Sequence, residues 1–254
     1  MSTESIEMYV VAHKEVDLSS LSLDSCYRLI RVGNYAKEKG KNTIADCTGD
    51  NISEKNPNYC ELTAHYWMWK NSNADVIGLC HYRRYFSVDK KQAISAKEIQ
   101  SILKNYDVIL PYRPLARRTV KNIYLDFGFE KDLDILSAVL KEKYPECFSE
   151  YQALMKRHSN YPANMLICKK SLFDEYSKWL FDILFEVERR CDLTGYTVQQ
   201  ARIFGFMSER LLEVWVRCKK LKIKNCQMLL TEEKTTLKGK VNKIISVAMS
   251  PFSI

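Results

Sequence analysis

The residues best suited to chemistry are two adjacent arginines, Arg83 and Arg84, which follow an apolar run at residues 75–80. A guanidinium group keeps its charge at any working pH and pairs with two phosphate oxygens at once. His81 and Tyr82 come directly before the arginines. The pattern predicts a site for an anionic ligand such as a diphosphate. The alternative is a strand end in which the arginines pack on aromatic rings for structural reasons.

The elements expected to position these arginines are the strands of an α/β fold. The run at residues 75–80 is predicted to be a buried strand, and residues 8–12 are predicted to be another, which ends at His13 and Lys14. Ligands of open α/β sheets bind beyond the carboxyl ends of the strands. His13 and Lys14 are therefore expected at the same edge as the arginines.

Capping patterns predict helices between the strands. Ser95 with Glu98 forms one capping box, and Asn58 with Glu61 resembles a second that opens a helix over residues 60–70. This order of helices and strands is typical of α/β folds. Further expected elements are strands at residues 107–110 and 165–168, a helix capped by Ser171, and a helix from about Thr197 to Trp215.

Length and composition predict one folded, cytoplasmic domain. The 254 residues are 46% apolar, which is enough for one large core. The amino end lacks the basic and apolar regions of a secretory signal, and no stretch approaches the ~18 apolar residues that a spanning helix needs. The nine cysteines show no paired short spacing, so we expect reduced core thiols.

Positive charge gathers toward the carboxyl end of this chain of net charge +8. Residues 217–254 are predicted to be a basic tail beyond a domain at residues 1–216. The end of this tail indicates a short basic amphipathic element, which would either dock on an anionic membrane or pack on the domain. The charge also suggests an alternative function, a non-catalytic nucleic-acid-binding protein.

The sequence contains none of the common nucleotide, protease, hydrolase or kinase signatures. The pair Asp132 and Asp134 has the Asp-x-Asp pattern of a metal clamp, but it lies in a predicted helix, where residues two apart point in different directions. Asp46, Asp50 and Asp75 remain lone candidates. We therefore predict no dedicated metal site, and the sequence leaves the metal question open.

Six segments together resemble the DUF4422 family, which comprises bacterial capsular and exopolysaccharide glycosyltransferases. They are residues 50–53, 58–71, 77–86, 164–167, 173–184 and 205–212, and the likeness covers most of residues 6–216. The resemblance implies an α/β fold: a GT-A-like, Rossmann-type mixed sheet flanked by helices, in a single domain with a helical C-terminal part.

The same resemblance implies a sugar donor and an acceptor. The implied donor is a nucleotide-diphosphate sugar, most simply a UDP-sugar such as UDP-galactofuranose or UDP-galactose. The implied acceptor is a capsular, exopolysaccharide or O-antigen glycan carried as a lipid-linked oligosaccharide. We therefore expect a cytoplasmic protein with peripheral contact to the inner face of the plasma membrane, and no nucleic-acid partner.

The resemblance also suggests roles for the residues near the arginines. Where other GT-A enzymes carry a metal-binding Asp-x-Asp, this chain has His81, Tyr82 and Arg83. Fixed positive charge could then neutralise the leaving diphosphate, so metal-independent transfer without a cofactor is the expectation, with Mn²⁺ or Mg²⁺ as the alternative. The residues expected to bind the donor are His13, Lys14, Asn51, His81, Tyr82, Arg83 and Arg84.

An inverting transfer needs a carboxylate that takes the proton of the acceptor hydroxyl. Glu209 is the first candidate, and its alternative role is an ordinary ion pair with Arg202 or Arg210. Asp50 is the second candidate, although its loop could hold the donor sugar. The residues expected to contact the acceptor are Asn164 and Tyr161.

Overall fold

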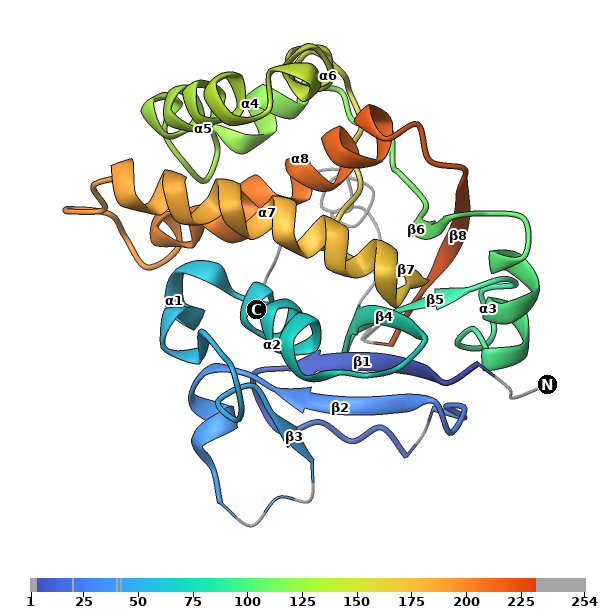
Figure 1. Cartoon of the computed structure of the whole chain (residues 1–254). Coiled ribbons are helices and arrows are strands. Elements are labelled where there is room, and N and C mark those ends of the chain that lie inside the picture. Colours follow the sequence, from blue (N-terminus) through green and yellow to red (C-terminus); the bar gives the residue numbers. More distant parts are fainter. Residues whose placement is uncertain (1–3, 20, 40, 42, 232–254) are drawn as a thin grey trace, which may run out of the picture.

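The computed structural model describes residues 4–19, 21–39, 41 and 43–231, which form a mixed eight-stranded sheet flanked by helices (Figure 1). Four parallel strands lie in the order β3-β2-β1-β4. Because the strands are parallel, their carboxyl ends meet at one edge of the sheet. The four strands are β1 (Ile6–Ala12), β2 (Tyr27–Arg31), β3 (Ile44–Ala45) and β4 (Val76–His81).

Strand β4 also belongs to a second group of strands, which closes into a small barrel. The first part of β4 pairs with β7, from Val76 to Leu79, whereas its last residue His81 pairs with Arg84 of β5. The pairings β5–β8, β8–β6 and β6–β7 complete the ring. The added strands are β5 (Arg84–Ser87), β6 (Val108–Pro111), β7 (Leu166–Lys169) and β8 (Ile223–Leu230).

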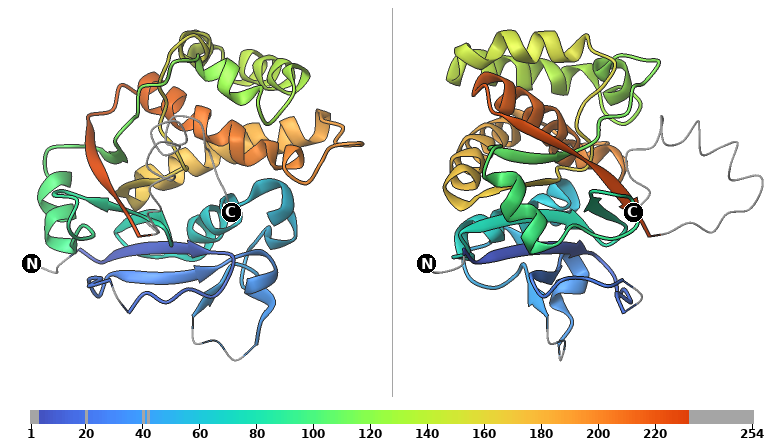
Figure 2. Two further views of the ribbon diagram at one scale, coloured as in Figure 1. Left: turned by 180° about the vertical axis from the view of Figure 1, so that it is seen from behind. Right: turned by 90° about the vertical axis from the view of Figure 1, so that its right-hand side faces the viewer.

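Helices cover the sheet in successive layers. Figures 1 and 2 show α7 and α8 between the strands and an outer layer formed by α4, α5 and α6. The main core fills the space between the helices and one face of the sheet, and a smaller core lies on its other face. The helices are α1 (Asn56–Tyr59), α2 (Leu62–Asn71), α3 (Ala96–Leu103), α4 (Val120–Tyr124), α5 (Glu130–Lys143), α6 (Pro145–Met155), α7 (Lys170–Arg190) and α8 (Ile203–Cys218). Short 3-10 turns lie at Gly33–Lys37, Ser53–Lys55 and Gln200–Arg202.

The mixed α/β single domain expected from the sequence is confirmed, but some helix starts are wrong. The capping box of Ser95 and Glu98 is present. The box predicted at Asn58 is absent, because Pro57 in the first turn starts α1 earlier, at Asn56. Cys60 then adopts a φ of +54°, which ends that turn before α2 begins. The last helix begins at Ile203, later than predicted, and α7 begins at Lys170 without a cap from Ser171.

The predicted boundary at residue 216 falls inside the fold. Helix α8 continues to Cys218, and β8 pairs with both β5 and β6. The amphipathic membrane element predicted near the carboxyl end lies outside the described residues. Among the helices of the described part, none is long and apolar enough to cross a membrane.

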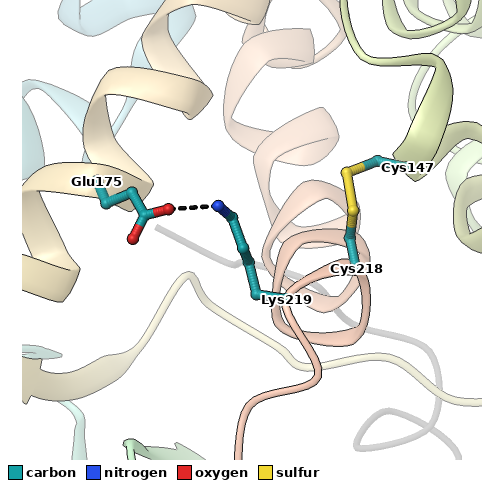
Figure 3. Close-up of a disulfide and its surroundings, with 4 residues drawn as sticks. All are labelled: Cys147, Glu175, Cys218 and Lys219. Carbon is teal, nitrogen blue, oxygen red and sulfur yellow. Dashed lines mark hydrogen bonds and ion pairs between the residues drawn. A yellow bond between two sulfur atoms is a disulfide. The ribbon is translucent and has the colours of Figure 1, made fainter.

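A disulfide joins the outer helix layer to the inner one. It links Cys147 of α6 to Cys218 at the end of α8 (Figure 3). The prediction that all nine cysteines are reduced is therefore wrong for these two, and the other seven are free thiols. Lys219, the residue after Cys218, donates to Glu175 of α7. The end of α8 is therefore attached to α6 by the disulfide and to α7 by this ion pair.

Candidate active site

Four predicted donor-binding residues meet at the carboxyl edge of the parallel strands. Strand β1 leads into His13 and Lys14, and β4 leads into Tyr82 and Arg83. The rings of His13 and Tyr82 lie edge to face, 5.6 Å apart. The ammonium of Lys14 and the guanidinium of Arg83 lie 5.6 Å and 4.9 Å from the centre of the Tyr82 ring. We call these four residues the edge cluster.

The edge cluster is electropositive. Burial is the main reason why the pKa of His13 lies below its ordinary value, and the charges of Lys14, Arg83 and Arg202 lower it further. A neutral imidazole among these cations leaves net positive charge at the edge, which favours an anionic ligand.

Arg202 reaches this edge from the 3-10 turn before α8, and its role there was missed by the sequence analysis. The guanidinium donates to Cys60 Sγ at 3.1 Å and to Gln199 Oε1 at 3.1 Å. In the sequence it lies far from Arg83, and no local pattern connects the two. From the sequence, Arg202 was expected only as an ion-pair partner of Glu209.

A set of polar side chains, here called the buried network, adjoins the edge cluster. Its members are the buried residues His81, Glu61, Asn164 and Glu209 and the half-buried Arg84. The His81 Nε2 atom lies 2.8 Å from the carbonyl oxygen of Ala163, so this nitrogen carries the proton and donates. Burial lowers the pKa of His81, which keeps the ring neutral. Burial also lowers the pKa of Arg84, an effect that the carboxylates of Glu209 and Glu61 oppose.

The network is held together by a strained turn at Ala163 and Asn164. Both residues adopt the left-handed region, with φ of +66° and +50°. Such a conformation costs roughly 1–3 kcal/mol at a non-glycine residue and concentrates at functional sites. The turn directs the Ala163 N–H to Glu209 Oε1 at 2.7 Å and the Asn164 side-chain Nδ2 to Glu61 Oε1 at 2.7 Å.

The amide oxygen of Asn164 is buried and accepts no hydrogen bond from the part of the chain that the structure describes. Its Nδ2 faces two acceptors, Glu61 Oε1 and the carbonyl oxygen of Gly205, so the orientation of the amide is fixed. A buried acceptor without a donor costs about 1–3 kcal/mol. A hydroxyl group of a bound ligand could donate to this oxygen, and the sugar contact expected for Asn164 stays a prediction.

The Glu209 carboxylate forms an ion pair, and its pKa nevertheless lies near neutral pH. Its Oε2 accepts from Arg210 Nη1 at 3.0 Å, which is one of the two ion pairs considered from the sequence. Burial nevertheless raises its pKa to about 7, because the opposing effects of Arg210 and the Ala163 N–H are smaller. A carboxylate with a pKa near the working pH is suited to general base catalysis.

This raised pKa predicts a pH dependence of stability. Between pH 4.5 and about 7 the folded protein keeps a proton on Glu209 that the unfolded chain releases, so folding becomes less favourable as pH rises. Relative to the Glu209→Gln variant, the wild type should lose about 3 kcal/mol of unfolding free energy over this range. Urea unfolding at several pH values measures this difference. A difference that stays constant with pH would show that the carboxyl group titrates normally.

Two of the predicted residues, Asp50 and Asn51, lie away from this site. Asp50 Oδ1 accepts from the Tyr66 hydroxyl at 3.3 Å, and the Asp50 backbone bonds to Asn71 at the end of α2. These partners lie five and ten residues after Glu61, about 7 and 15 Å along the helix. Asn51 caps its own loop by donating to the carbonyl oxygen of Gly49. The structure does not bring either residue to the buried network.

The remaining predicted residues have other surroundings. Tyr161 is buried under the guanidinium of Arg113, 4.9 Å away, at a separate cavity. Asp132 accepts from the Tyr196 hydroxyl, and Asp75 binds the amino end of the chain at Ser5. Asp46 is buried and accepts from Ser53. Within the described ranges no three His, Cys, Asp or Glu side chains are grouped to hold a metal ion.

The fold and the site define a class of protein: a mixed α/β domain in which a cationic edge cluster adjoins a buried network that contains carboxylates. The chain belongs to the family described as DUF4422, a domain of unknown function, whose profile matches residues 7–220. No protein with a curated description matches it. A similar solved structure is the apo form of the WbbM bifunctional glycosyltransferase, with 28% identity and a TM-score of 0.79. The match covers 91% of this chain and 46% of that one, so the chain spans about half the length of that protein.

Proposed function

We propose that this protein is a glycosyltransferase that moves a sugar from a nucleotide-diphosphate donor to a glycan acceptor. The observation that carries the proposal is the edge cluster, which gathers His13, Lys14 and Arg83 around the Tyr82 ring at the carboxyl ends of β1 and β4. A Rossmann-type, GT-A-like use of the sheet would place the donor diphosphate at this edge. The likeness to a glycosyltransferase structure supports the same function.

The chemistry that we propose divides between the two groups of residues. The cations of the edge cluster hold the donor diphosphate and stabilise the negative charge that grows on it as the bond from the sugar to the phosphate oxygen breaks. Glu209 takes the proton from the acceptor hydroxyl while the new glycosidic bond forms. The orphan oxygen of Asn164 accepts from a sugar hydroxyl, which fixes the ring relative to Glu209.

The finer assignments in this proposal come from the family resemblance. We propose a UDP-sugar donor, with galactose in its furanose or pyranose form, and a lipid-linked oligosaccharide of a capsule, exopolysaccharide or O-antigen as acceptor. Peripheral contact with the inner membrane face would bring the enzyme to that acceptor.

A panel of nucleotide sugars, UDP and a mixed oligonucleotide, each tested for its effect on Tm, separates this function from nucleic-acid binding. Stabilisation by the oligonucleotide but not by UDP would contradict the proposal.

We further propose that transfer does not need a divalent cation, because Arg83 and Lys14 supply fixed positive charge at the diphosphate. Turnover of the identified donor should therefore change less than about twofold when EDTA is added. A metal that stabilised the transition state by about 1.4 kcal/mol would instead give about a tenfold loss. The measurement is the initial rate with EDTA, with added Mn²⁺ and with added Mg²⁺. Loss of turnover in EDTA and its recovery with Mn²⁺ would refute metal independence.

A further inference from the structure

A second group of cations surrounds a buried carboxylate one helical turn beyond Glu209. Glu213 on α8 is fully buried, and its Oε1 accepts from Arg113 at 2.5 Å and from Arg217 at 2.8 Å. The guanidinium of Arg157 lies 3.6 Å from the same oxygen. Three arginines from three parts of the chain therefore converge on one carboxylate.

These arginines carry more charge than the carboxylate can neutralise. A cavity of about 400 Å³ beside them is lined by Arg113 and Arg217, by the further cation Lys220, and by the carboxylate of Glu150. Three cations and one carboxylate therefore line the cavity. Counting also Arg157 and Glu213, which pair with each other beside it, there are four cations to two carboxylates, and the excess charge is positive. The side chains of Arg113, Arg157 and Arg217 are 28%, 37% and 28% exposed, so each of them is still partly open to solvent.

The walls of the cavity are suited to a polar ligand. The Arg113 guanidinium lies over the ring of Tyr161, 4.9 Å from its centre, and Asn225 lines the same cavity. A planar guanidinium held in this way presents its donors in a fixed direction, as phosphate recognition requires. The volume lies in the range of small-ligand sites.

The cavity lies close to the candidate active site. Glu209 and Glu213 are four residues apart on α8, which corresponds to about 6 Å along the helix axis. Tyr161 lines the cavity and Asn164 belongs to the buried network, and these two residues are at most about 11 Å apart along the chain. A ligand could therefore occupy the cavity while another part of it reaches Glu209.

We infer that this cavity is a second oxyanion site, which binds a phosphoryl group of the acceptor. The basic lining alone points to a phosphoryl oxyanion, whereas its assignment to the acceptor rests on the proposed function. The donor diphosphate is bound at the edge cluster, so a second phosphate site near Glu209 serves the other substrate. It would hold the acceptor by its charged end, with the reacting hydroxyl directed toward the carboxylate.

Lys220→Asn tests the site, because this lysine lines the cavity and, among the described residues, is not one of the ion-pair partners of Glu213. Its backbone φ of +53° suits asparagine, which tolerates the left-handed region. The matched control is Lys219→Gln, since the ammonium of Lys219 is bonded to Glu175 on α7 (Figure 3). Both variants are made in an Arg83→Gln background, which weakens anion binding at the edge cluster.

The probe is inorganic pyrophosphate, titrated by calorimetry. Lys220→Asn should weaken its binding about threefold to tenfold, and Lys219→Gln should leave it unchanged. Arg113→Gln should also weaken it, provided that its Tm shows a folded protein. Equal pyrophosphate affinity in the Lys220→Asn and Lys219→Gln proteins would overturn the inference.

A second experiment distinguishes a lipid headgroup from a soluble phosphate as the ligand of this site. Phosphatidylcholine vesicles with or without a polyprenyl diphosphate are sedimented with the same proteins. If only the diphosphate vesicles bind, and Lys220→Asn reduces this binding, the site takes a lipid headgroup; if only free pyrophosphate binding responds to the substitution, the site takes a soluble phosphate. A protein that transfers sugar but fails both experiments keeps the proposed function and loses this site.

Discussion

Replacing Glu209 with glutamine is expected to lower kcat by about 10²- to 10⁴-fold, the usual contribution of a general base. Glutamine keeps an oxygen for the Ala163 N–H but cannot accept a proton. Donor affinity should change little, because the diphosphate contacts proposed above lie in the edge cluster and not at Glu209. The measurement is steady-state kinetics together with donor binding to the variant. A loss of kcat below about tenfold would remove Glu209 as the base.

The pH profile distinguishes a base from a residue that only holds the fold. In the wild type, kcat/KM should fall as pH drops below about 7, where Glu209 becomes protonated. The residual activity of Glu209→Gln should lack this acidic limb. Asp132→Asn is the matched control, because Asp132 is another buried carboxylate that accepts from a backbone N–H and a side chain. This control should keep both kcat and the wild-type pH profile.

Replacing Arg83 with glutamine is expected to weaken donor binding about 10- to 100-fold, since a hydrogen bond to a charged group contributes about 1.5–3 kcal/mol. The guanidinium lies beside the Tyr82 ring at the edge where the diphosphate is proposed to bind. Arg83→Lys should give an intermediate loss, because lysine keeps the charge without the planar fork. Calorimetry with UDP and the donor measures the effect.

A surface arginine provides the control for Arg83. Arg118 forms an ion pair with Asp126 and is about as exposed as a typical surface side chain, at 42%. Arg118→Gln removes the same charge from the protein and should leave UDP affinity unchanged. If Arg83→Gln bound UDP as tightly as Arg118→Gln, the edge cluster would not be the diphosphate site.

The part of the site that could be predicted is the part set by strand direction. His13 and Arg83 each follow a strand, and parallel strands end at a common edge, so local patterns were enough to predict that they meet. Asp50 shows the limit of this reasoning. It follows β3, but the intervening loop runs along α2, and nothing in its composition indicates that direction.

The features that were missed depend on contacts between distant segments. The Cys147–Cys218 disulfide spans 71 residues, and the position of Arg202 depends on how α8 packs. The barrel requires β8 to insert between β5 and β6, which a basic run of residues does not suggest. The left-handed pair at Ala163 and Asn164 contains no glycine, and the asparagine alone does not indicate that the alanine before it is also left-handed.

Strand β4 has a consequence for how the protein can move. It pairs with β1 on the proposed nucleotide side and with β7 and β5 of the barrel. A hinge rotation between these two halves would break one of its hydrogen-bond ladders. We therefore expect that loops rearrange to enclose the substrates while the sheet stays fixed, and that the two halves do not undergo hinge closure.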